Sequence, residues 1–286
     1  MKDKICLITG GTNGIGRSTA HELASKGATV VIVGRDARKT SQVVEEIRRA
    51  SGNDTVDSLL ADLSSQQEVR RLANEFETKY SHLDVLLNNA GAVFMQRQLS
   101  VDGIEMTFAL NHLASFLLTN LLLDKIKASA PARIINVSSG AHTSGKIVFD
   151  NLQGELAFSS RAYGNSKLAT ILFAMELARR LEGTGVTANS LHPGFVSTGF
   201  GKNNPGFLMK VIRAVVPLIA RSPEKGAETS IYLASSPDVQ SITGRYFVDR
   251  KLTQPAPLAT NTVVARKLWD ISAEMVHLAD GLPAKT

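Results

Sequence analysis

The sequence contains a single cysteine and a single tryptophan, and aromatic residues make up only 6% of its 286 residues. One cysteine, Cys6, cannot form a disulfide within the chain and cannot build a cysteine-based metal site. The six histidines also lack the spacing of metal ligands. We therefore expect no metal centre, and the low cysteine content fits a reducing compartment such as the cytoplasm.

Long hydrophobic runs are missing as well, because no uninterrupted apolar stretch reaches about 18 residues. A strand-like pattern begins at Lys4, which leaves no room for a signal peptide before it. We therefore expect no transmembrane anchor. The stretch 207–220 is apolar but carries Lys210 and Arg213, so we interpret it as a helix that covers an active site. Contact of this stretch with a membrane surface is the alternative.

The chain lacks a concentrated basic patch, although its net charge is +6. Pairs such as Arg48–Arg49 and Arg70–Arg71 have acidic neighbours, a pattern typical of solvated helix faces. No nucleic-acid-binding motif accompanies the charge, so we expect no nucleic-acid partner. Attraction for a phosphorylated cofactor explains the surplus of positive charge better.

Short apolar runs alternate with stretches of helical periodicity. Such strands, separated by helices, indicate a parallel sheet covered on both faces. We predict one doubly wound α/β domain over residues 1–286, with ligands at the carboxyl ends of its strands. The predicted strands are 5–8, 29–33, 56–60, 85–87, 133–137, 186–191 and 246–248, and the predicted helices are 15–26, 38–50, 66–80, 106–127, 163–181, 226–235 and 263–278.

A glycine-rich loop, residues 9–16, follows the first predicted strand and begins the first helix. Glycines permit a tight turn and let backbone amides approach a pyrophosphate at the helix N-terminus. The position between a strand and a helix is the context that such a motif requires. The candidate cofactor-binding residues in it are Gly10, Thr12, Asn13, Gly14, Ile15 and Gly16.

The end of the second predicted strand indicates which dinucleotide binds. An acidic residue there would bind a ribose 2′-hydroxyl, but this strand ends Val33-Gly34-Arg35. The guanidinium of Arg35 suits a 2′-phosphate, which favours NADP(H) over NAD(H). Asp36 leaves the alternative open, because its carboxylate could serve a free 2′-hydroxyl if it turned inward.

Lys167 lies four positions after Tyr163 in a predicted helix, so the two side chains are on the same face. A phenol has an ordinary pKa of about 10 and is a poor acid or base at neutral pH. A neighbouring ammonium favours the phenolate and lowers that pKa, which would let the pair transfer a proton.

Together these motifs resemble the short-chain dehydrogenase/reductase family, and stretches such as Asn111–Leu113 and Phe149–Glu155 resemble its retinol dehydrogenase-like group. The resemblance implies a Rossmann-like three-layer sandwich with a mostly parallel seven-stranded sheet. The further matching segments, in family order, are Asp62–Leu63, Asn88–Gly91, Asn111, Val137–Ser139, and Pro193–Gly194 followed by Thr198.

The resemblance also implies four catalytic residues. Tyr163 would be the general acid in carbonyl reduction and the general base in alcohol oxidation, while Lys167 would lower its pKa and bind the nicotinamide ribose. Ser139 would donate to the substrate oxygen, although its neighbour Ser138 is distinguished from it by family register alone. Asn111 would hold a water that links Lys167 to solvent, and a cap at a local helix kink is the alternative.

Other implied contacts complete the expected site. The segment 199–222 would cover the substrate. His192 is interpreted as a packed or loop histidine rather than a catalyst. The remaining residues expected to line the cofactor are Asp62, Leu63, Asn89, Ala90, Gly91, Pro193, Gly194, Val196 and Thr198.

We therefore predict an NADP-dependent oxidoreductase, an alcohol dehydrogenase or carbonyl reductase, for a small apolar alcohol, aldehyde or ketone. One alternative is a ring double-bond reductase of the protochlorophyllide-reductase type, whose active-site cysteine has no counterpart here beyond Cys6. Another is a non-catalytic NADPH-binding regulatory protein, although all four catalytic positions are intact. The apolar helices at 106–127 and 163–181 could pair subunits, so a monomer and a homo-oligomer both stay open.

Overall fold

A computed structural model describes residues 1–158, 161–196 and 220–278. It contains one eight-stranded sheet in the order β3-β2-β1-β4-β5-β6-β7-β8. Strands β1 to β7 pair in parallel and β8 is antiparallel to β7. The strands are β1 (Ile5–Thr9), β2 (Thr29–Gly34), β3 (Val56–Leu60), β4 (Val85–Asn88), β5 (Ala132–Val137), β6 (Val186–His192), β7 (Tyr246–Val248) and β8 (Lys251–Thr253).

The expectation of seven strands was one strand short. The chain turns from β7 into β8 at Asp249 and Arg250, whose φ angles are 50° and 63°. Two successive residues with positive φ make a tight hairpin turn, a conformation that usually requires asparagine, aspartate or glycine. Because Arg250 is none of these, the hairpin could not be recognised from its turn residues.

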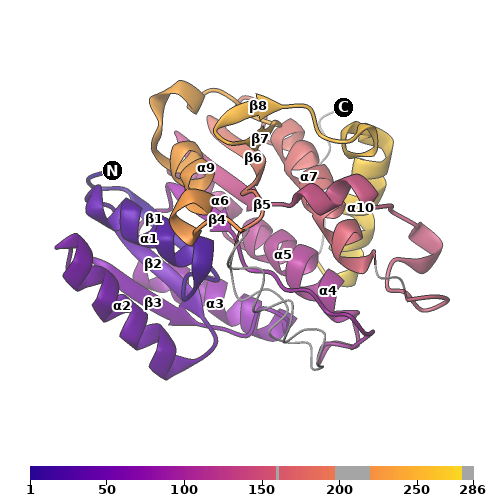
Figure 1. Ribbon diagram of the computed structural model, residues 1–286, viewed down its shortest axis with the longest axis horizontal. Coiled ribbons are helices and arrows are strands. Elements are labelled where there is room, and N and C mark those ends of the chain that lie inside the picture. The colour runs from indigo at the N-terminus through magenta and orange to yellow at the C-terminus, as the bar shows by residue number, and fades with distance from the viewer. Residues whose placement is uncertain (159–160, 197–219, 279–286) are drawn as a thin grey trace.

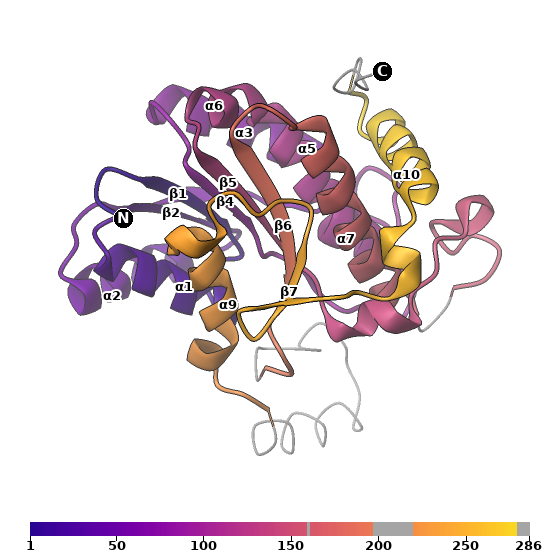
Figure 2. The same ribbon diagram turned by 90° about the horizontal axis from the view of Figure 1, so that it is seen from above.

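Side chains of the sheet alternate between two helical layers, which Figures 1 and 2 show on its opposite faces. Ile5 and Leu7 of β1 pack in one hydrophobic core, and Cys6 and Ile8 pack in the other. This arrangement confirms the doubly wound three-layer prediction. One layer holds α1 (Gly14–Ser25), α2 (Ala37–Ser51) and α9 (Pro223–Ser235), and the other holds α3 (Gln66–Lys79), α4 (Met106–Phe108), α5 (Ala114–Leu121), α6 (Leu123–Ala128), α7 (Ala162–Arg180) and α10 (Thr262–Met275).

The order of the strands reverses between β1 and β4, which are neighbours in the sheet. In open α/β sheets the ligand binds outside the carboxyl ends of the strands at such a point. The glycine-rich loop follows β1 and the segment Asn89–Gly91 follows β4. The topology therefore brings these two motifs together at the expected binding edge.

The helix predicted over 106–127 is not continuous. A π-helical turn, Ala109–Leu113, separates α4 from α5, and α6 follows after Leu122. Apolar periodicity does not reveal an inserted residue of this kind, because residues 107–119 are buried nearly all round and show no single apolar face. The π turn contains Asn111, and such turns frequently occur at functional sites.

The predicted C-terminal helix is confirmed as α10, which packs across α5 and α7. Its Trp269 is 2% exposed and stacks on Phe173 with ring centroids 5.8 Å apart, while Phe116 meets it edge-on at 4.8 Å. The Arg180 guanidinium lies 4.3 Å from the centre of the indole. Part of the apolar α5–α7 surface that could have paired subunits is therefore covered by the chain itself. No helix within the described ranges is long and apolar enough to span a bilayer.

Trp269→Ala should lower the free energy of unfolding by about 3–5 kcal/mol, because it leaves a cavity between three helices. Urea unfolding followed by far-UV circular dichroism measures this loss. Val263→Ala in the same helix is the matched control, since Val263 is 75% exposed and its truncation removes little buried surface. Equal effects of the two substitutions would contradict the described packing.

Candidate active site

The glycine-rich loop has the geometry of an anion-binding loop. Gly10 and Gly14 have φ angles of 64° and 50°, and a Cβ on Gly16 would lie 2.4 Å from the Gly10 carbonyl oxygen. Asn13 makes no side-chain cap at the start of α1, whereas side chains cap α2, α3, α9 and α10. The first-turn amides of α1 are thus left for a ligand, and they fit a dinucleotide pyrophosphate.

The loop after β4 is bonded directly to the glycine-rich loop. The Asn89 side-chain amide donates to the carbonyl oxygens of Thr9 (2.8 Å) and Gly10 (3.2 Å). The backbone amides of Asn89 and Ala90 donate to Thr9 Oγ1 at 2.9 and 3.0 Å. Asn89 therefore holds the binding loop in place, and Thr9, absent from our candidate residues, shares that role. Its position at the end of β1 was the available signal.

The end of β2 has no room for an acidic side chain. A Cβ on Gly34 would lie 2.2 Å from Thr40 Oγ1 and 2.6 Å from Thr12 Cγ2. Arg35 is exposed beside it. The Asp36 carboxylate accepts from the Lys39 amide at 2.9 Å and caps α2, so it is engaged at the helix rather than turned inward.

Two further candidates serve the local structure. Asp62 Oδ1 accepts from the backbone amide and the hydroxyl of Ser64, at 3.0 and 2.7 Å. Leu63 is buried in the hydrophobic core that contains α3. Both residues lie after β3, at the binding edge of the sheet, but the described contacts of their side chains are within the protein.

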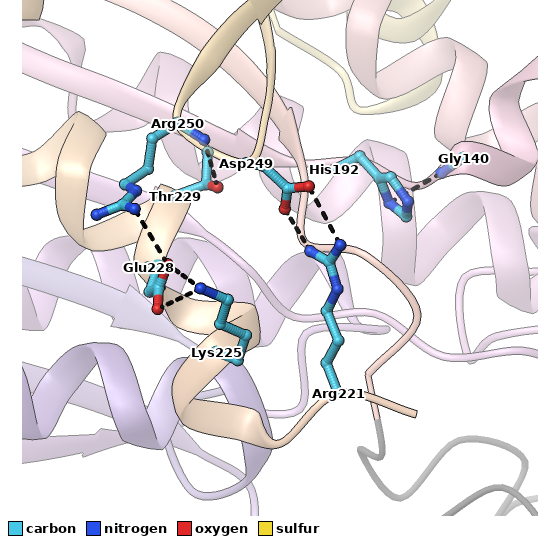
Figure 3. Close-up of polar contacts among 8 residues, drawn as sticks. All are labelled: Gly140, His192, Arg221, Lys225, Glu228, Thr229, Asp249 and Arg250. Carbon is cyan, nitrogen blue, oxygen red and sulfur yellow. Dashed lines mark hydrogen bonds and ion pairs between the residues drawn. The ribbon is translucent and has the colours of Figure 1, made fainter. Parts of the chain in front are cut away.

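The chain enters and leaves the segment 197–219 at one place beyond β6. Val196 forms a parallel β-bridge with Arg221, and the Arg221 amide donates to the Phe195 carbonyl at 2.8 Å. Figure 3 shows the Arg221 guanidinium paired with the Asp249 carboxylate of the β7–β8 turn. Thr198 and nearly all of the expected substrate-covering segment lie outside the described residues.

The predicted catalytic residues come together from α7, the end of β5, the π turn and the adjoining β4 loop. The Lys167 ammonium donates to the Val137 carbonyl at 2.9 Å and lies 5.7 Å from the centre of the Tyr163 ring. The Ser139 hydroxyl is hydrogen-bonded to Tyr163. A Cβ on Gly91 would lie 3.3 Å from Lys167 Nζ, so only a glycine lets the β4 loop approach this amine so closely.

The structure distinguishes the two adjacent serines. Ser138 is 2% exposed, and its hydroxyl donates to the backbone carbonyl of Lys167 at 2.7 Å. That bond fixes α7 against the end of β5 and engages the Ser138 hydroxyl with the backbone. Ser139, whose hydroxyl contacts Tyr163, is therefore the serine placed for chemistry.

Asn111 links the β4 loop to α7. Its Oδ1 accepts from the Ala92 amide at 2.8 Å, and its Nδ2 donates to the Ala92 carbonyl and to Ser166 Oγ, both at 3.0 Å. Ser166 in turn donates to the Tyr163 carbonyl at 2.8 Å. The side chain thus makes tertiary bonds rather than capping a local kink, and its role in a water relay stays a prediction.

Burial controls the ionisation of the central pair. It raises the pKa of the Tyr163 phenol, and the Ser139 hydrogen bond opposes this only in part. Burial also lowers the pKa of Lys167 from 10.5 to about 8. The expectation that Lys167 brings the Tyr163 pKa below its ordinary value is therefore wrong for the protein without ligand, because desolvation disfavours both charged forms.

A groove of about 1000 Å³ runs between α1, α2 and α9. It touches the binding loop through Asn13 and Gly14, but none of the four catalytic candidates lines it. Its wall carries both charge signs, including Arg17, Glu46 and Glu228. The groove is therefore separate from the four catalytic candidates.

This sheet, with a binding loop at its switch point and a tyrosine–lysine pair beside it, defines a dinucleotide-dependent oxidoreductase. The family described as short chain dehydrogenase matches residues 4–206, and the chain belongs to that family. Retinol dehydrogenase 11 from Homo sapiens is 42% identical over 279 residues, covering 97% of this chain and 87% of that protein. Retinol dehydrogenase 14 from Homo sapiens is 45% identical over 294 residues, covering 97% and 88%.

A solved structure supports the same placement. The Pseudomonas aeruginosa RhlG/NADP active-site complex has a TM-score of 0.69 and 30% identity, and the match covers 86% of this chain and 94% of that chain. Within the family, the sequence relatives place this chain in the retinol dehydrogenase-like group. The resemblance inferred from the motifs is thereby confirmed.

The depressed pKa of Lys167 predicts a pH dependence of stability. The unfolded chain binds more protons than the folded one between about pH 8 and the ordinary lysine pKa of 10.5, so stability rises through that window. Between about pH 7 and about pH 9.5, the free energy of unfolding of the wild type should rise by about 2 kcal/mol relative to that of Lys167→Met, which has no titrating amine at this position. Urea unfolding of both proteins at the two pH values tests this, and parallel profiles would contradict it.

Proposed function

We propose that this protein transfers a hydride between NADP(H) and a small apolar alcohol, aldehyde or ketone. The observation that carries the proposal is the cluster of half-buried Tyr163 and Ser139 with buried Lys167, which the β4 loop joins to the glycine-rich loop. The similarity to retinol dehydrogenases 11 and 14 supports an apolar primary alcohol or its aldehyde, so retinol and retinal are the first probes.

In this proposal Tyr163 transfers the proton. Its raised pKa keeps the phenol protonated at neutral pH, which is the state that a general acid needs for carbonyl reduction. Ser139 donates to the same substrate oxygen and stabilises charge there as it develops. When bound, the nicotinamide cofactor supplies the hydride in reduction and accepts it in oxidation. Lys167, buried behind Tyr163, would bind the ribose hydroxyls and add positive charge when protonated.

The preference for NADP(H) is supported by the end of β2. The contacts at Gly34 exclude an acidic side chain, and Asp36 is engaged as a helix cap. Arg35 is exposed at the same edge, where its guanidinium could bind a 2′-phosphate through two hydrogen bonds.

The first alternative, a ring double-bond reductase with a catalytic cysteine, is disfavoured by the position of Cys6. This thiol lies in the middle of β1 and is fully buried, and burial raises its pKa to about 12. It therefore has no path to a substrate. The second alternative, a non-catalytic NADPH-binding protein, is disfavoured by the assembled contacts of Ser139, Tyr163 and Lys167.

Arg35→Ala should weaken NADPH binding by about 1.5–3 kcal/mol and leave NADH binding nearly unchanged, because it removes a charge-assisted bond to the 2′-phosphate. Fluorescence titration with each dinucleotide measures both dissociation constants. Arg49→Ala, which removes an exposed charge from the far end of α2, is the control. Wild-type protein that binds NADH as tightly as NADPH would refute the preference.

Tyr163→Phe should reduce kcat for retinal reduction by about 10²–10⁴-fold, because the ring and its packing stay while the proton donor is lost. NADPH affinity and the unfolding midpoint should change little. Tyr232→Phe on α9 is the matched control for loss of a phenol. The assignment of Tyr163 as proton donor fails if its variant keeps more than about a tenth of wild-type turnover.

A further inference from the structure

Two histidines hold the peptide bond that follows the catalytic serine. His192, at the end of β6, accepts at Nδ1 from the Gly140 amide with an N–N distance of 3.0 Å. His142 Nδ1 lies 2.7 Å from the Ser139 carbonyl oxygen. That carbonyl and that amide belong to one peptide unit. An imidazole therefore binds each of its two polar ends.

The contacts define the proton on each ring. His192 accepts at Nδ1, so it is neutral with its proton on Nε2. His142 accepts at Nε2 from the Ala256 amide at 3.1 Å, so its proton is on Nδ1 and is donated to Ser139. The two rings are thus opposite tautomers, one an acceptor and one a donor toward the same peptide.

The surroundings keep both rings in place. His192 packs closely against Gly140, where an added Cβ would be 3.3 Å from its Nε2. His142 is 4% exposed, and its ring centroid is 5.1 Å from that of Tyr246. The titratable groups that face His192 are His142, Arg221 and Asp249, and Figure 3 shows the Arg221–Asp249 pair next to it.

The peptide they hold sets the direction of the catalytic hydroxyl. Ser139 has an extended backbone and is the N-cap of the 3-10 turn Gly140–Ser144. Its Oγ accepts from the Ala141 amide at 3.2 Å and is bonded to Tyr163. A rotation of the peptide between Ser139 and Gly140 would displace the Ala141 amide and so remove the hydrogen bond that fixes the direction of the Ser139 hydroxyl.

We propose that His192 and His142 are positioning residues that hold the Ser139–Gly140 peptide and thereby direct the Ser139 hydroxyl at Tyr163. A protonated His192 has no acceptor for the Gly140 amide, so the arrangement is lost in acid. Burial lowers the pKa of His192, and the Arg221 charge acts in the same direction while Asp249 opposes it, so the surroundings favour the neutral ring that the Gly140 contact requires. The effect of the two histidines on turnover rests on the proposed function, whereas their contacts with the Ser139–Gly140 peptide do not.

The geometry is tested without any substrate. Long-range ¹H–¹⁵N NMR of the full chain labelled with ¹⁵N-histidine at pH 7.5 should show His142 as the Nδ1–H tautomer and His192 as the Nε2–H tautomer. The Gly140 amide should exchange slowly with solvent. A protonated His192, or His192 in the Nδ1–H form, would overturn the proposal.

Two substitutions of His192 separate its hydrogen bond from its volume. His192→Phe keeps a ring and removes the acceptor, whereas His192→Asn places Oδ1 where Nδ1 was and does not titrate. The Phe variant should speed hydrogen exchange of the Gly140 amide at least about tenfold. It should also raise the pKa of Tyr163, because the Ser139 bond that lowers this pKa is lost, and ¹³Cζ-tyrosine NMR measures the shift. The Asn variant should resemble wild type in both measurements. A Tyr163 pKa that does not differ between the two variants would reduce His192 to a packing residue.

Kinetics with retinal and NADPH complete the test. His192→Phe should lower kcat about 10–10²-fold with KM for NADPH changed less than about threefold, because a misdirected group affects turnover rather than cofactor binding. His192→Asn should have a kcat close to that of the wild type. Its profile of kcat against pH should lack any fall in acid that is due to His192. His21→Asn, a half-buried histidine of α1 that contacts none of the catalytic candidates in the described hydrogen bonds, is the control and should match wild type. Equal impairment of the Phe and Asn variants would contradict the proposal. A wild type that turns over no probe would refute the proposed function and leave the two NMR measurements to decide the geometry.

Discussion

The loop that follows β4 is the constraint on which both halves of the site depend. At its start, Asn89 and Ala90 bond to Thr9 and Gly10, and so fix the glycine-rich loop. Two residues later, Ala92 bonds to Asn111 of the π turn. One short stretch of backbone therefore sets the distance between the place where a pyrophosphate would bind and the place where a proton would move.

Burial of Tyr163 and Lys167 shifts the pKa values of both groups. A lysine and a tyrosine in water would both titrate near pH 10, too far from neutrality to exchange protons readily. Burial lowers the pKa of Lys167 to about 8 and raises the pKa of Tyr163, so at neutral pH the phenol keeps its proton while the ammonium stays charged by a narrower margin than in water. Negative charge that develops on a substrate oxygen would then meet a poorly solvated site in which each added positive charge counts more than in water.

Much of the fold was predictable because burial on two faces leaves a simple pattern, and the apolar runs of β1 to β7 display it directly. Other features escaped prediction for physical reasons. The β8 strand follows a turn whose second residue, Arg250, is not a usual turn residue, and the π turn lies in a segment that is buried nearly all round and so has no single apolar face to show it. In the site, Tyr163 and Lys167 carry a local spacing signal. His192 does not, since its partner is a backbone amide 52 residues away.

The C-terminal helix extends the same reasoning to a part of the chain remote from the motifs. Ser272 of α10 is hydrogen-bonded to His112 Nε2 at 2.8 Å, and His112 lies next to Asn111 in the π turn. Burial lowers the pKa of His112 to about 3, so this ring stays neutral and the contact does not titrate at working pH. A continuous set of contacts thus runs from α10 through the π turn and Asn111 to the β4 loop. The packing of Trp269 that stabilises α10 therefore also supports the backbone on which the binding loop and the lysine–tyrosine pair depend.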